Sequence, residues 1–105
     1  LEKGLIGVVK VFASRDERQR NAVVIAHELL HTLGATDKYE ARSLLPVFPD
    51  GYAEPARVPR HPQALAEIMA GRIPLSADTA AIPDSLRETR IGPQTAAETG
   101  LTSSP

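Results

Sequence analysis

The sequence has no cysteine and no tryptophan, and it has only one methionine, two phenylalanines and two tyrosines among its 105 residues. Without cysteine the chain can form neither disulfide bonds nor metal–thiolate bonds, so any zinc site must use nitrogen and oxygen ligands. With so few aromatic residues, the core must consist mainly of aliphatic side chains. The absence of cysteine does not indicate the cellular compartment.

Long apolar runs and an excess of one charge are also missing. No stretch approaches the roughly 20 apolar residues that a membrane-spanning helix needs, and no signal peptide is visible. The 12 lysines and arginines against 13 aspartates and glutamates give a formal net charge of −1. Because no basic patch stands out, we expect no nucleic-acid partner and no membrane segment within this chain.

What remains is the composition of an ordinary globular domain, 42% hydrophobic and 24% charged. Its length fits a single hydrophobic core. We predict one domain or fragment over residues 1–105, divided into a strand with a helix (1–34), a loop-rich segment (35–82) and C-terminal helices with a tail (83–105). The first residue is Leu1 and an apolar run follows at once, so we expect the natural protein to continue upstream.

The N-terminal third predicts a strand followed by a helix. Residues 5–12 are mostly β-branched or large apolar residues, which indicates a buried strand. Ser14 and Glu17 have the spacing of a capping box, so the helix should begin near Arg15. An apolar stretch continues the helix until Gly34, which allows a left-handed stop.

The remaining segments predict loops and short helices. Repeated prolines indicate that residues 44–61 form an irregular loop. Residues 63–70 should form a short helix or a turn that Gly71 ends. Prolines at the start of residues 83–90 and 93–99 predict one or two short C-terminal helices. The expected fold class is α+β and mostly helical, with a long central helix, one or few N-terminal strands and short C-terminal helices.

His27, Glu28 and His31 form the pattern H-E-x-x-H within the predicted helix. At about 100° per residue, the two histidines lie one turn apart and roughly 40° from each other around the helix axis. Both imidazoles can therefore reach one ion. Glu28 lies on an adjoining strip, from which its carboxylate can approach a water molecule on that ion. Polar groups in so apolar a stretch need partners, and a metal would supply them.

This pentad predicts hydrolytic chemistry. The alternative is that its members are ordinary core or surface residues, but the pattern is rare by chance and its helical context favours metal binding. Zinc lowers the pKa of a bound water molecule to roughly 7, and a nearby carboxylate can take its proton during attack on a carbonyl group. Glu28 is thus the candidate general base, and afterwards the acid that protonates the leaving amine.

Gly34 and Asp37 extend the pattern to H-E-L-L-H-T-L-G-A-T-D. The stretch resembles the metzincin metallopeptidases, whose pattern ends in histidine or, in the snapalysin-type branch, in aspartate. The resemblance implies that Asp37 is the third metal ligand. Gly34 would let the chain turn sharply out of the helix so that Asp37 can reach the ion. Taken alone, Gly34 would be an ordinary helix cap and Asp37 an exposed turn residue.

A second resemblance lies at residues 67–71, E-I-M-A-G, which look like the metzincin Met-turn. It implies that Met69 lies beneath the zinc site; otherwise a lone methionine fills a gap in the core. The resemblance also implies a zincin-like catalytic domain whose long helix carries the active site, and it slightly favours a secreted or cell-envelope protein. Metzincins place several strands before this helix, whereas only residues 5–12 stand there in this chain. We therefore expect a truncated or reduced version of the family, in preference to a related fold that shares only the helix and its ligands.

Other interpretations stay open. Glu67 would be the third ligand if residues 64–69 formed a helix, as in gluzincin peptidases. His61 is a weaker candidate ligand, and we expect it to be exposed to solvent. Tyr39 could stabilise an oxyanion, although a packed ring with a solvated hydroxyl is the expected role. The metal could also be structural, in a non-catalytic module that binds a protein partner.

The hypothesis from the sequence is a zinc metalloendopeptidase with one zinc ion per chain and a peptide or protein substrate. Peptide cleavage follows from the resemblance, whereas the metal chemistry follows from the residues themselves. The site comprises three metal ligands, one catalytic acid and base, and two structural supports: His27, His31 and Asp37; Glu28; Gly34 and Met69.

Overall fold

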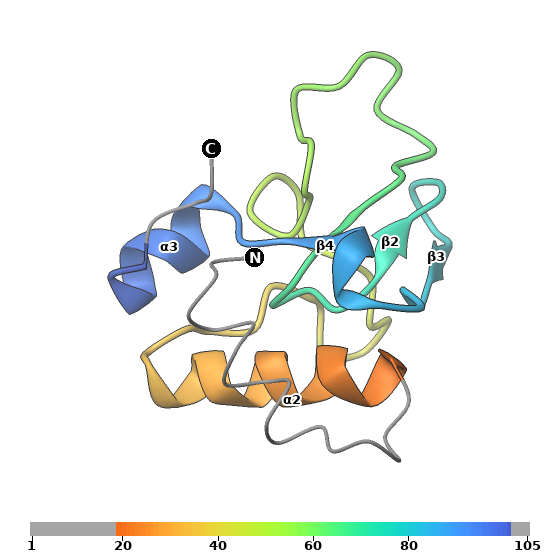
Figure 1. Ribbon diagram of the computed structural model, residues 1–105. Coiled ribbons are helices and arrows are strands. Elements are labelled where there is room, and N and C mark those ends of the chain that lie inside the picture. The colour runs from red at the N-terminus through yellow and green to blue at the C-terminus, as the bar shows by residue number, and fades with distance from the viewer. Residues whose placement is uncertain (1–18, 102–105) are drawn as a thin grey trace.

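A computed structural model of the chain describes residues 19–101. Its α-helices are α2 (Gln19–Thr32) and α3 (Pro93–Thr99), and a 3-10 turn, η1, covers Leu86–Glu88. The strands, each two residues long, are β1 (Ala66–Glu67), β2 (Ile73–Pro74), β3 (Ala80–Ala81) and β4 (Thr89–Arg90). Figure 1 shows α2 along one side of the molecule, with the strands and α3 on the other.

One face of α2 is apolar and faces the core. Ala22, Ala26 and Leu30 follow one another at intervals of four residues and are all buried, which is the spacing that aligns side chains along a helix. Val24, on another face, is 60% exposed. The helix is therefore held by packing along this face, while the face that carries Val24 and Glu28 is exposed to solvent.

The C-terminal end of α2 is a Schellman motif around Gly34. The φ angle of Gly34 is 106°, a left-handed conformation that residues with a Cβ rarely adopt. The Gly34 N–H donates to the His31 carbonyl over 3.1 Å, and the Ala35 N–H donates to the Leu30 carbonyl over 3.0 Å, as this motif requires. The predicted left-handed stop is confirmed, and it leads the chain into the segment that carries Asp37.

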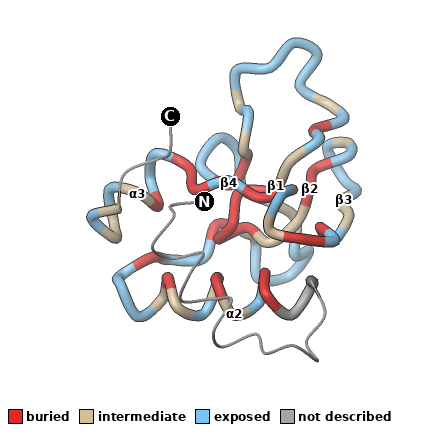
Figure 2. Tube along the Cα trace, in the orientation of Figure 1, coloured by how far each residue is buried: buried red, intermediate tan, exposed pale blue. Residues whose placement is uncertain are grey.

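The strands form two small two-stranded sheets. β1 and β4 pair in parallel, with Ala66 opposite Thr89, and β2 and β3 pair antiparallel, with Ile73 opposite Ala81. Ala66 and Thr89 have no exposed surface. The β1–β4 pair therefore lies at the centre of the fold, where the buried stretches gather in Figure 2.

The core is aliphatic, as the composition predicts. Leu30 from α2 and Ile68 and Met69 after β1 are fully buried within it. Its buried members come from α2, from the turn that follows α2 and from the segments beside the β1–β4 pair: Ala22, Val23, Ala26, Leu30, Ala35, Ile68, Met69 and Ile91. Within residues 19–101, no helix has both the length and the apolarity to cross a membrane.

The prediction of an α+β fold is confirmed, but the prediction that it is mostly helical is wrong for the described residues, most of which lie in loops and turns. Of the two segments expected to supply one or two C-terminal helices, residues 83–90 form no α-helix; they contain η1 and then β4. Local pattern favours a helix there, but pairing with β1, distant in the sequence, overrides it. The predicted helix at 93–99 is confirmed, and residues 44–61 are irregular as predicted.

Two further predictions lie outside the residues that the structure describes. The strand expected at residues 5–12 lies wholly outside them. The same holds for the expected helix start near Arg15; the part of this helix that lies within residues 19–101 is the 14-residue α2, and no longer helix is shown.

Candidate metal centre

α2 brings His27, Glu28 and His31 together on its solvent-accessible side. The two imidazole rings lie edge to face with their centroids 4.8 Å apart. One ligand atom from each of the three residues lies within 4.8 Å of the others. These three residues could hold a metal ion, as the H-E-x-x-H spacing predicts.

Each histidine is oriented by a backbone carbonyl. His27 Nδ1 lies 2.9 Å from the Ile68 carbonyl oxygen, and His31 Nδ1 lies 2.9 Å from the Ala35 carbonyl oxygen. A carbonyl oxygen only accepts hydrogen bonds, so in both rings Nδ1 carries the proton. A neutral imidazole in this tautomer has its lone pair on Nε2, and this arrangement is common among metal-binding histidines.

Both Nε2 atoms converge on the carboxylate of Asp37. Asp37 Oδ1 is 3.0 Å from His27 Nε2 and 2.9 Å from His31 Nε2. Three atoms with lone pairs therefore meet at one point, which is repulsive unless protons or a cation lie between them. Zinc bonds of about 2.0–2.2 Å in a tetrahedral arrangement separate neighbouring ligand atoms by roughly 3.3 Å. The measured separations are close to this value, so the donor set fits zinc.

Glu28 is placed differently from Asp37. It belongs to the group of ligand atoms within 4.8 Å, whereas Asp37 lies at hydrogen-bond distance from both imidazoles. Glu28 is exposed and forms no hydrogen bond with any residue between 19 and 101. The shorter distances favour Asp37 over Glu28 as the companion of the two histidines, which leaves the Glu28 carboxylate beside the cluster.

The segment around Asp37 is tied to α3 by an ion pair. Lys38 is buried, and its Nζ lies 2.6 Å from Glu98 Oε1. Thr36 joins the same group, because its N–H donates to Glu98 Oε1 over 2.9 Å. The hydrogen bond from Lys38, then that from the Thr36 backbone, lowers the pKa of Glu98 to about 2. Asp37 is thus flanked on both sides by residues that Glu98 holds.

Residues 67–71 form a turn, one of the two predicted alternatives, and this turn supports both sides of the cluster. The Gly71 N–H donates to the Glu67 carbonyl over 3.0 Å, and Gly71 has a φ of 74°. The carbonyl of Ile68 accepts from His27, and the next carbonyl, that of Met69, accepts from the Lys38 N–H over 3.0 Å. Met69 itself is fully buried, so the turn is anchored in the core.

Glu67 does not lie on a helix, as the alternative with Glu67 as the third ligand requires. Residues 64–69 contain β1 and the start of the turn, so the alternative helix is wrong. The Glu67 carboxylate is fully buried and accepts from the N–H groups of Met69 over 2.6 Å and Gly92 over 2.9 Å. It joins the turn to the start of α3 instead.

His61 belongs to a separate group. Its Nε2 lies 2.7 Å from the hydroxyl oxygen of Tyr52, and it is half-buried rather than exposed as predicted. Burial raises the pKa of Tyr52, and the nearby Arg60 partly offsets this. Within the described residues, the group that could hold a metal does not include His61.

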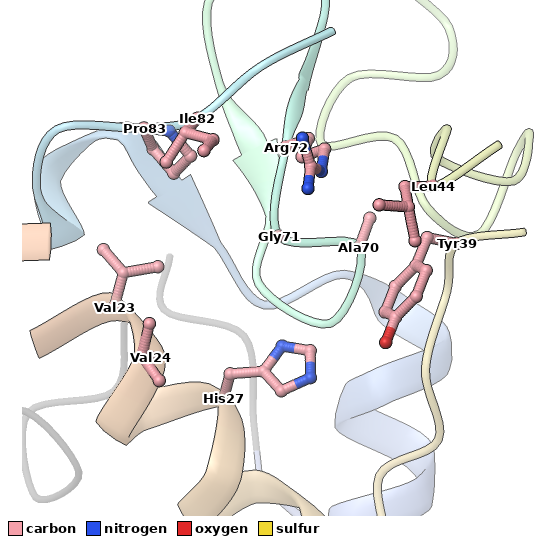
Figure 3. Close-up of a pocket in the computed structure, with 10 residues that line it drawn as sticks. All are labelled: Val23, Val24, His27, Tyr39, Leu44, Ala70, Gly71, Arg72, Ile82 and Pro83. Carbon is pink, nitrogen blue, oxygen red and sulfur yellow. The ribbon is translucent and has the colours of Figure 1, made fainter. Parts of the chain in front are cut away.

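A cavity of about 440 Å³ adjoins the cluster on the His27 side. Tyr39 lines it, and Figure 3 shows the Tyr39 hydroxyl directed toward the His27 side of the cavity. Apolar side chains, among them Val23 and Val24, form much of the remaining wall, and Arg72 contributes a guanidinium group. Sequence reasoning missed this cavity, Lys38 and Glu98, because segments far apart in the chain create them.

Comparison with models of protein families, with curated proteins and with solved structures finds no match to this chain. The functional argument therefore rests on the geometry of the cluster itself.

Proposed function

We propose that this chain is a zinc-dependent peptidase in which His27, His31 and Asp37 hold the ion and Glu28 is the acid and base. The observation that carries the proposal is the convergence of both Nε2 atoms on Asp37 Oδ1, at 3.0 and 2.9 Å. Because both Nδ1 atoms are occupied by carbonyl groups, the Nε2 lone pairs are available to a cation. Two neutral imidazoles and one carboxylate suit zinc.

The exposure of the site supports catalysis rather than a purely structural ion. The side chains of His31 and Asp37 are 32% and 43% exposed, so a substrate can approach. Structural zinc sites are usually closed by four protein ligands, whereas catalytic sites keep one position open. In the proposal the chain supplies three ligands and leaves the fourth position to water or substrate.

The chemistry divides between the ion and Glu28. Zinc, when bound, makes a water molecule more acidic and polarises the carbonyl group of a substrate. Glu28 takes the proton of the attacking water and passes it to the nitrogen of the leaving amine. The Ile68 and Ala35 carbonyl groups keep both imidazoles in the tautomer that this mechanism needs. The polypeptide substrate class comes from the metzincin resemblance.

The test combines metal content with peptide cleavage. Purified protein is equilibrated with zinc, its metal content is measured by mass spectrometry, and cleavage of a peptide library is followed. We expect about one zinc per chain, hydrolysis that a chelator abolishes, and a loss of at least ~100-fold in activity for Glu28→Gln with zinc retained. Asp37→Asn should weaken zinc binding, whereas Asp50→Asn, at an exposed carboxylate outside the cluster, should not.

Each failure has a distinct meaning. Zinc bound at the cluster with no cleavage of any peptide would make the metal structural and would end the peptidase proposal. No zinc uptake by the unmodified protein would end the metal proposal as well. Full zinc binding by Asp37→Asn would remove Asp37 from the ligand set.

A further inference from the structure

The cavity beside His27 has the size and surface of a small-ligand site. Its volume of about 440 Å³ falls within the ~300–1,000 Å³ that is usual for such sites. Apolar side chains from separate segments form its walls; two of them, Val24 and Ile82, are 60% and 54% exposed. Exposed apolar side chains that surround a cavity indicate a surface that an apolar group can cover.

Arg72 is the exception in this apolar lining. Figure 3 shows it beside Gly71, on the wall opposite His27. It is half-buried and forms no hydrogen bond or ion pair with any residue of the described part. Two other arginines do have partners: the Arg57 guanidinium donates to the Pro62 carbonyl oxygen, and Arg60 stacks on the Phe48 ring.

The Arg72 guanidinium has no partner among the described residues and lies in apolar surroundings. Such a group indicates a site for an anionic ligand. Arginine carries five N–H donors in a plane, and a carboxylate accepts two of them side by side. Among residues 19–101, no aspartate or glutamate lines the cavity, so this part of the chain offers no carboxylate there. The partial burial of Arg72 removes water that would weaken such a pair, which strengthens its attraction for an anion.

We propose that this cavity binds an apolar peptide residue and that Arg72 pairs with a carboxylate on that residue or on its neighbour. The identification of this peptide as a substrate rests on the proposed function, but the binding itself does not. The carboxylate can be the C-terminus of the peptide or the side chain of an adjacent aspartate or glutamate. Arg72 is thereby a specificity-determining residue for the cleavage reaction.

Binding of small probes tests the proposal without requiring catalysis. N-acetyl-leucine, which has a terminal carboxylate, is compared by calorimetry and by NMR with the uncharged N-acetyl-leucinamide. The C-terminal amide of N-acetyl-leucyl-glutamate, compared with that of N-acetyl-leucyl-glutamine, tests a side-chain carboxylate. Each titration is done on zinc-loaded and on chelator-treated protein, because a carboxylate can also bind zinc directly. The variants are Arg72→Gln, Arg72→Lys and the control Arg87→Gln, at an exposed arginine outside the cavity.

We expect one of the two acidic probes to bind about tenfold more tightly than its uncharged partner, since a hydrogen-bonded charge pair contributes about that factor. The preference should disappear in Arg72→Gln, be partly kept in Arg72→Lys, and be unchanged in Arg87→Gln. It should also persist without zinc. Which probe shows the preference identifies the source of the carboxylate.

Two results would overturn the proposal. One is an equal preference for acidic probes in the unmodified protein and in Arg72→Gln; the other is no preference at all in the unmodified protein. A protein that binds the probes in this way but cleaves no peptide would leave the cavity as a carboxylate site and would count against the peptidase proposal alone. Circular dichroism of the variants confirms that Arg72→Gln is folded.

Discussion

The imidazole of His27 donates from Nδ1 to the backbone carbonyl of Ile68 over 2.9 Å, across a separation of 41 residues. This bond joins α2 to the turn at residues 67–71, whose next carbonyl accepts from Lys38. One turn therefore positions residues on both sides of the candidate metal site. Changes in the core beneath this turn should affect metal binding as well as stability.

Met69→Ala should show this coupling. Met69 is fully buried, so truncation leaves a cavity and should lower the free energy of unfolding by about 2–5 kcal/mol. Zinc affinity should fall too, because the turn that carries the Ile68 carbonyl loses its anchor. Urea unfolding and zinc titration measure the two effects. Met69→Leu conserves volume and should cost less than ~1.5 kcal/mol; a Met69→Leu variant that stays stable but loses zinc would show that the sulfur atom itself matters.

Glu98→Gln should loosen the segment that carries Asp37. The substitution leaves the buried Lys38 ammonium without its charged partner, which should cost on the order of 2 kcal/mol of folding free energy. Zinc affinity should fall although Glu98 touches no ligand in the proposal. Glu54→Gln, at an exposed position, is the matched control. Unchanged stability and unchanged zinc affinity in Glu98→Gln would refute the role of the ion pair.

Glu98 should also make the free energy of unfolding depend on pH in the acidic range. Its pKa is lowered from 4.5 to about 2, so between these values the unfolded chain binds the proton and the folded chain does not. The stabilisation from Glu98 is complete above about pH 4.5 and is lost as the pH falls toward 2. The stability difference between the unmodified protein and Glu98→Gln should therefore shrink over this range in urea unfolding. A difference that stays constant would contradict the lowered pKa.

Gly34→Ala should be more damaging than a glycine substitution at the end of α3. Both Gly34 and Gly100 have positive φ angles, 106° and 75°, so alanine strains the backbone at each by about 1 kcal/mol. At Gly34 the new Cβ would also lie 2.9 Å from the Glu98 carbonyl oxygen, whereas at Gly100 no atom of the described residues lies within 4 Å. Thermal unfolding of both variants should show the larger loss for Gly34→Ala. Equal losses of stability would mean that the structure accommodates the contact between the new Cβ and α3 without a loss of folding free energy.

The local features of the site could be predicted from the sequence because they depend on neighbouring residues. Helical spacing is enough to place His27 beside His31, and Gly34 ends α2 by its own backbone freedom. Helical geometry also places the carboxylate of Glu28 near both imidazoles. The convergence of Asp37 on the histidines agrees with what the metzincin resemblance implies, although its role as a ligand stays a prediction.

The features that failed or were missed depend on long-range contacts. Residues 83–90 begin with a proline, which favours a helix start, but Thr89 is fully buried opposite Ala66 in a parallel pair. Glu67 was a possible ligand only if residues 64–69 formed a helix, as the resemblance to gluzincin peptidases would require. Three backbone N–H groups in the core satisfy it instead, those of Met69, Ala70 and Gly92, and no local pattern in the sequence reveals such partners.

α3 takes part in a long-range interaction at each of its two ends. Its start is fixed by the bond from the Gly92 N–H to Glu67, and near its end Glu98 holds Lys38. Since each helical residue adds about 1.5 Å and 100° of rotation, inserting or deleting one residue in α3 would turn Glu98 away from Lys38. The number of residues between Gly92 and Glu98 is therefore constrained by the site, even though the helix itself lies outside the candidate metal cluster. Related chains that keep the cluster should vary in the loop at 44–61 long before they vary in the length of α3.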